Sequence, residues 1–145
     1  MAQIRYPANY NASAYEAIRI ESIDKQVFFP VVQKRLMDGA ATSIVVQNLS
    51  TTSTASVTFY YKASCYGFSD VAVGPYTIPV GGSINHNHRL SGPGSGTGQH
   101  NLPDGWCGSL KVVSSNQAID GFGQITNITT YSGDTIMAYN AVTRP

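Results

Sequence analysis

The sequence predicts an all-β protein built as an antiparallel β-sandwich with an extended N-terminal arm. Short runs of alternating apolar and polar residues recur along the chain, and clusters of Gly, Pro, Ser and Asn separate them. No segment repeats its apolar residues at the i, i+3, i+4 spacing of an amphipathic helix. At 145 residues, the chain can bury the core of one ordinary domain and is too short for two comfortable ones.

The predicted strands follow one another at short intervals. Turn residues such as Asp38-Gly39, Val80–Ser83 and Ser114–Gln117 separate consecutive apolar runs. Eight or nine strands at this spacing are typical of an immunoglobulin-like or jelly-roll sandwich. In chain order, we expect strands at Ala17–Ile23, Gln26–Lys34, Thr42–Leu49, Ala55–Lys62, Val71–Ile78, Ser83–Leu90, Gly108–Ser114, Ala118–Asn127 and Thr135–Val142.

Alternation along these strands predicts which side chains form the core. In the strand Ala55–Lys62, one face carries apolar residues and the other carries Thr58, Tyr60 and Lys62. The side chains expected inside are Ile44, Val46, Val57, Phe59, Tyr61, Leu110 and Val112. Trp106 is expected to pack over one end of the sandwich.

The chain divides into an arm, residues 1–25, and a sandwich domain, residues 26–145. The arm is surplus to a closed sandwich, yet it is not composed like a disordered tail, because it is rich in Tyr and Ile and poor in charge. Exposing that apolar surface to water is unfavourable, so we expect the arm to pair with a sheet edge. It would do so as a donor strand on the next subunit or, as the alternative, as an extra edge strand on its own domain. Its contact residues would be Ile4, Tyr6, Tyr10, Tyr15, Ile18 and Ile20.

Composition excludes several classes of function. The net charge is +1 and charged residues make up only 12% of the chain, so the basic surface of a nucleic-acid-binding protein is missing. The longest apolar run, near Val27–Val32, is far shorter than a membrane span of about 20 residues. The N-terminus MAQIRYPANY shows no export signal. Low charge favours packing against many copies of the same chain.

Candidate chemical sites are few. His86 and His88 point the same way on a strand, and His100 follows, but no Asp, Glu or Cys lies at ligand spacing. We therefore expect these histidines on an exposed strand face, with no metal site. The glycine-rich segment Gly92–Gly98 lacks the Lys-Ser/Thr of a phosphate loop and is interpreted as an insertion between strands. Acidic residues are scattered, so we expect neither an enzyme nor a bound cofactor.

The two cysteines and three asparagines bear on localisation. Cys65 and Cys107 both lie next to turns where strand ends can meet, which favours a disulfide closing a loop of about 40 residues. Two buried thiols are the alternative. The sequons at Asn11, Asn48 and Asn127 could accept glycans in an exported protein. Together these features predict an extracellular or cell-surface location.

Several segments in order resemble a β-sandwich module of bacterial secreted and surface proteins, often found in tandem. The matching segments are Val27–Val32, Thr42–Ser50, Ala55–Tyr61, Leu102–Trp106, Gly108–Ser114 and Asp134–Val142. The resemblance implies a structural or adhesive extracellular unit without catalytic residues. The histidine-bearing strand, the glycine-rich insertion and the cysteine pair depart from the pattern.

An internal similarity suggests how copies could be joined. Ala14-Tyr-Glu-Ala-Ile18 repeats the pattern of Ala138-Tyr-Asn-Ala-Val142, as if the arm were the last strand of a preceding module. The leading hypothesis is a non-enzymatic, pilin-like subunit that polymerises by strand addition between copies. A monomeric adhesive or carbohydrate-binding module, contacting surface glycans through Tyr side chains and the loop Ser91–Leu102, is the alternative. A viral or phage structural protein is the third hypothesis.

Overall fold

The computed structural model describes residues 2–6, 11–15, 24–36, 39–89, 102–127 and 136–143. The described residues form ten β-strands. The strands are β1 (Ala2–Tyr6), β2 (Asn11–Tyr15), β3 (Gln26–Gln33), β4 (Ala40–Asn48), β5 (Ala55–Ala63), β6 (Val71–Ile78), β7 (Ser83–Asn87), β8 (Cys107–Ser114), β9 (Ile119–Asn127) and β10 (Ile136–Asn140). Strands β3 to β10 confirm eight of the nine predicted strands to within a few residues. The ninth, Ala17–Ile23, lies outside the described residues.

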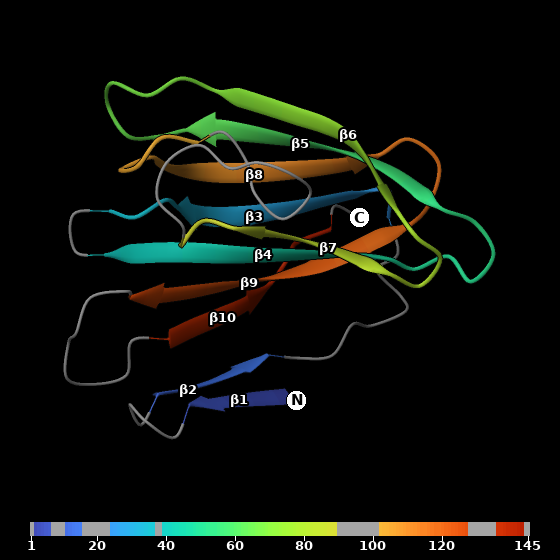
Figure 1. The fold of residues 1–145 in the computed structure, drawn as a ribbon, viewed down its shortest axis with the longest axis horizontal. Helices are drawn as coiled ribbons and strands as arrows, with labels where there is room; N and C mark the ends of the chain where they lie inside the picture. Colours follow the sequence, from blue (N-terminus) through green and yellow to red (C-terminus); the bar gives the residue numbers. More distant parts are fainter. Residues whose placement is uncertain are drawn as a thin grey trace.

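Two four-stranded antiparallel sheets pack against each other and form the predicted sandwich. One sheet has the order β10-β9-β4-β7 and the other has the order β3-β8-β5-β6, as can be followed in Figure 1. Neighbours in each sheet are mostly distant in sequence. Strand β8, for example, pairs with β3 on one side and with β5 on the other.

The core lies between the sheets and contains the side chains that alternation predicts. Ile44, Val46, Val57, Phe59 and Val112 are fully buried, and Tyr61 and Leu110 are 1% exposed. Trp106 is also fully buried, and its ring meets that of Tyr61 edge to face at 5.8 Å between centroids. Burial of these aromatic side chains accounts for much of the hydrophobic stabilisation of the domain.

One side of the sandwich is closed by connections between the sheets. Backbone hydrogen bonds join Phe28 of β3 to Val142 in both directions, at 2.9 and 2.8 Å. Just before β3 begins, Asp24 pairs with Ile119 of β9. The Tyr139 hydroxyl of β10 donates to the carbonyl oxygen of Val31. The β3 and β10 edges are thus tied together.

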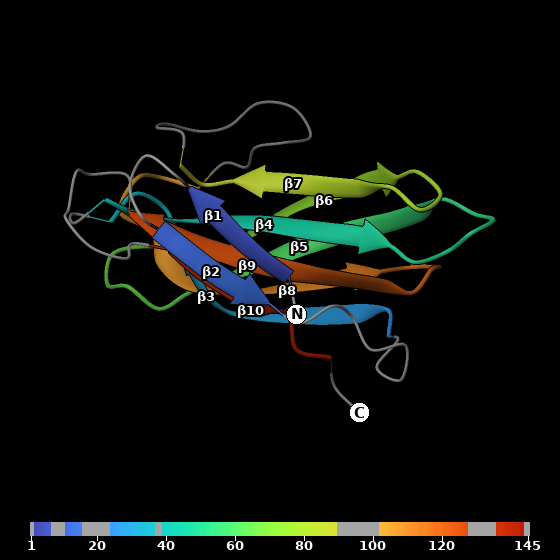
Figure 2. The same ribbon diagram turned by 90° about the horizontal axis from the view of Figure 1, so that it is seen from below.

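The beginning of the chain forms a hairpin rather than a single extended strand. Strand β1 pairs with β2 from Ala2↔Tyr15 to Tyr6↔Asn11, which satisfies backbone groups that an extended arm would leave to a partner. The hairpin belongs to neither main sheet, and β2 contacts β10 (Figures 1 and 2). Of the predicted contact residues, Ile4, Tyr6 and Tyr15 therefore lie in the hairpin, while Tyr10, Ile18 and Ile20 lie outside the described residues.

Candidate functional site

A groove crosses the outer face of the β3-β8-β5-β6 sheet. Its volume is about 690 Å³, within the range of small-molecule sites in proteins. All four strands contribute to its walls. The lining residues are Phe28, Phe29, Pro30, Tyr60, Tyr61, Lys62, Asp70, Val71, Ala72, Ser109, Leu110, Lys111 and Val142.

The groove arises from the order of large and small side chains across the sheet. Sheet register places Phe28, Lys111, Tyr60 and Ala72 in one row, each opposite the next on the neighbouring strand. Ser109, two residues from Lys111, faces the same side and lies opposite Lys62. Small side chains at Ser109 and Ala72 beside long ones leave the surface hollowed, because the pleat brings cross-strand side chains within about 5 Å.

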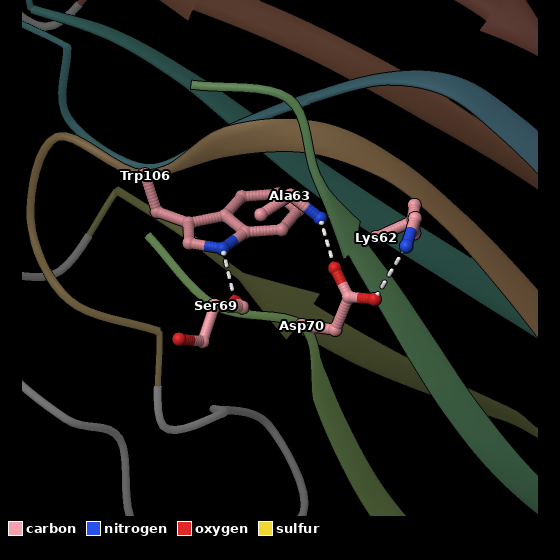
Figure 3. A network of polar contacts seen from close by, with 5 residues as sticks. All are labelled: Lys62, Ala63, Ser69, Asp70 and Trp106. Carbon is pink, nitrogen blue, oxygen red and sulfur yellow. Dashed lines mark hydrogen bonds and ion pairs between the residues drawn. The ribbon is translucent and has the colours of Figure 1, made fainter. Parts of the chain in front are cut away.

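Charged groups stand at one end of the groove. Lys62 Nζ donates to Asp70 Oδ2 at 2.7 Å, and the Ala63 backbone N–H donates to Asp70 Oδ1 at 2.9 Å (Figure 3). The hydrogen bond from Lys62, followed by that from Ala63, lowers the pKa of Asp70. Asp70 is therefore a carboxylate at neutral pH, and it compensates the charge of Lys62.

Lys111 has a different environment. Its Nζ lies 5.3 Å from the centroid of the Tyr60 ring, close enough for a cation–π interaction. Among the described residues, the ion pairs are Arg35–Asp104 and Lys62–Asp70, and Lys111 takes part in neither. Lys111 is thus a half-buried cation beside an aromatic ring, without a carboxylate partner in the described part of the chain.

The connection from β5 to β6, which carries Asp70, is fastened to β8. Trp106 Nε1 donates to the Ser69 carbonyl oxygen at 3.2 Å, as Figure 3 shows. Cys65 in the same connection forms a disulfide with Cys107, with Cα atoms 5.4 Å apart, the usual separation for such a bond. The predicted disulfide is present, and it secures the segment that ends at the groove.

The expectation that His86 and His88 lie on an exposed strand face is wrong. Both side chains are fully buried: His86 lies on the inward face of β7, and His88 follows directly after that strand. The alternation of β7 was correctly identified, but its Asn residues, not its His residues, point to solvent: Asn85 is exposed. A neutral imidazole can enter a core when it finds a hydrogen-bond partner there, and the core supplies one for the Nδ1 of each ring.

Hydrogen bonds and ring contacts explain why both imidazoles are tolerated in the core. His86 Nδ1 lies 2.7 Å from the Tyr61 hydroxyl, and its ring stacks on Phe59 at 3.9 Å. His88 Nδ1 lies 2.6 Å from the Thr42 carbonyl oxygen. Burial lowers the pKa of His86 to about 4 and that of His88 to about 3, so both are neutral at pH 7. The pair is part of the core and not a site open to a ligand.

The glycosylation expectation fails at Asn48. This side chain is fully buried, and its Nδ2 donates to the carbonyl oxygens of Ser53 at 2.8 Å and Pro79 at 3.0 Å. A glycan on that nitrogen would replace one of its two N–H donors and could not fit at a fully buried position of the folded domain. Asn11 lies in β2 and Asn127 at the end of β9, where modification stays a prediction.

The third histidine, His100, and the glycine-rich segment Gly92–Gly98 lie outside the described residues. Within the described ranges, no three His, Cys, Asp or Glu side chains gather in a way that could hold a metal ion. The same ranges contain no helix of the length and apolarity that crossing a membrane requires.

Sequence reasoning missed the groove. Alternation correctly assigned Tyr60, Lys62 and Lys111 to outward faces, but it does not specify which strands are neighbours. Pairing of β8 between β3 and β5 is a long-range property, and it brings Phe28 and Tyr60 to either side of Lys111.

No protein-family model, no curated protein and no solved structure matches this chain. The fold is that of an all-β sandwich of two four-stranded antiparallel sheets.

Proposed function

We propose that this protein is a non-enzymatic structural subunit that joins copies of itself into an extracellular filament or surface array through its N-terminal hairpin. The observation that carries this proposal is that the N-terminal hairpin is a separate two-stranded sheet outside the two sheets of the sandwich. Among the residues whose side-chain burial the structure describes, every member of the main buried cluster lies between Val27 and Ile119, and β1 and β2 lie outside both sheets, beside the edge strand β10.

Exchange of the hairpin between copies would give an open assembly. The surface of β10 that receives β2 in one chain can receive β2 of a neighbour by the same contacts, as in domain swapping. The hairpin and β10 are different surfaces, so the resulting head-to-tail interface need not close. A repeated interface of this kind builds a fibre. Strand addition to the β10 edge would add main-chain hydrogen bonds to the interface.

The chemistry of the chain supports an extracellular setting. The Cys65–Cys107 disulfide is of a kind that persists in oxidising compartments and is rare in the cytosol. A charged fraction of 12% keeps electrostatic repulsion between packed copies low.

Deletion of residues 1–22 tests the proposal. We expect the full chain to form polymers that are visible by negative-stain microscopy and elute early in size-exclusion chromatography. The truncated chain should stay folded and elute as a monomer, because its core is intact. The control is Tyr66→Ala, at a fully exposed side chain away from the hairpin, which should polymerise normally. Filaments of unchanged appearance from the truncated chain would refute the role of the hairpin.

A further inference from the structure

We propose that the groove on the outer face of the β3-β8-β5-β6 sheet binds an acidic sugar unit, a hexuronate within a polysaccharide. The site combines an aromatic platform, a cation next to that platform and polar groups along the rim. This proposal is independent of the self-association proposed above, because the groove and the β10 edge belong to different sheets.

Tyr60 supplies the platform. Its side chain faces outward from the middle of the sheet and is 44% exposed, and Phe28 and Ala72 lie in the same cross-strand row. One face of a pyranose ring is made of C–H groups, which pack favourably on an aromatic face because both surfaces are apolar and flat. The side chain of Ala72 is only a methyl group, so it leaves room beside Tyr60 for a pyranose ring.

Lys111 supplies the charge selectivity. Lys62 is compensated by Asp70 at 2.7 Å, whereas Lys111 belongs to neither ion pair of the described residues. A carboxylate on a sugar stacked against Tyr60 would therefore meet Lys111 rather than a neutralised pair. Salt screens an ion pair less in a half-open groove than on a flat, fully exposed surface. The net positive charge of the groove thus favours an acidic sugar over a neutral one.

Polar groups at the rim suit sugar hydroxyls. The hydroxyl of Ser109 lies on the same side as Lys111 and can donate and accept, while the Asp70 carboxylate is an acceptor held in place by Lys62 and Ala63. Small-molecule sites combine a largely apolar wall with a few such placed polar groups.

A peptide is a poorer match. The groove lies on the face of a sheet, where the backbone donors and acceptors of β5 and β8 are already paired within the ladder. An extended peptide carries a donor and an acceptor on nearly every residue and would find no main-chain partners there. A sugar needs only the side chains that the groove offers.

Isothermal titration calorimetry of the intact protein tests the proposal with tri-galacturonate, tri-mannuronate and tri-glucuronate, each beside its neutral trisaccharide. We expect at least one acidic trisaccharide to bind, with an affinity that falls as salt rises. Tyr60→Ala should weaken that binding about tenfold or more. Lys111→Gln should weaken it about three- to tenfold while leaving the neutral trisaccharide unaffected.

Matched controls separate recognition from misfolding. Tyr66→Ala and Lys25→Gln change an exposed Tyr and an exposed Lys outside the groove and should bind as the unmodified protein does. All variants should unfold at unchanged temperature. Absence of binding to all three acidic trisaccharides would overturn the proposal, as would binding that survives both groove substitutions. Equal or tighter binding of a Glu-Gly hexapeptide would also overturn it, because it would show attraction to charge alone.

Discussion

At the scale of single residues, the histidines show how a polar side chain becomes part of an apolar core. His86 is inserted between Phe59, on which it stacks, and Tyr76, which meets it edge to face at 5.5 Å, while its nitrogen engages the Tyr61 hydroxyl. Burying these imidazoles is tolerable because the rings stay neutral and the Nδ1 of each has a hydrogen-bond partner. The alternation of residues along the chain cannot predict that the histidines are buried, because Asn and His are both polar. Packing against the opposite sheet decides which of the two faces the core.

The buried histidines predict a loss of stability in mild acid. Their folded-state pKa values, about 4 for His86 and about 3 for His88, lie below the ordinary value of 6.5, so the unfolded chain binds protons first. Their stabilisation is complete above pH 6.5 and is lost as the pH falls below it. Between pH 7.5 and pH 5.5, the free energy of unfolding should fall by about 2 to 3 kcal/mol, as measured by urea denaturation.

A variant isolates the origin of this dependence. His86→Gln keeps a hydrogen-bonding partner for Tyr61 but cannot titrate, so it should lose about half of the pH effect whatever its absolute stability. Asp120, whose pKa is raised by burial, acts in the opposite direction. A free energy of unfolding that is the same at pH 7.5 and pH 5.5 would show that the imidazoles do not resist protonation.

At the scale of elements, the strands were more predictable than their partners. The run Val57, Phe59, Tyr61 on one face of β5 follows directly from the period of two residues per pleat, and all three are in the core. The N-terminal segment was harder, because its composition indicates that it must pair with something but not with what. The structure pairs β1 with β2, a local contact that closes at a small cost in loop entropy.

The β5–β6 connection depends on its covalent link to β8. The disulfide spans 42 residues and restricts the unfolded chain, so the double substitution Cys65→Ala/Cys107→Ala should lower the free energy of unfolding by about 4 kcal/mol. Urea denaturation measures the loss. Thiol titration of the unmodified protein under denaturing, non-reducing conditions should find no thiol. Detection of two thiols would contradict the bond.

At the scale of the whole molecule, the protein is a β-sandwich whose two proposed contact surfaces lie on different sheets. One side is sealed by the Phe28–Val142 and Asp24–Ile119 pairings, and the outer face of one sheet carries the groove. The hairpin lies at the other sheet, against β10. Low charge predicts a protein that assembles with copies of itself, but the position of the proposed contact surfaces depends on the pairing of distant strands.

The most direct test of the central claim is binding of the N-terminal segment in trans. A synthetic peptide of residues 1–22 is added to the chain that lacks them, and binding is measured by calorimetry. We expect one peptide bound per chain, with binding weakened by Met137→Lys on the exposed part of β10, and shortened filaments when the peptide is added to the full chain. A truncated chain that binds no peptide would contradict the claim that the N-terminal hairpin connects one subunit to the next.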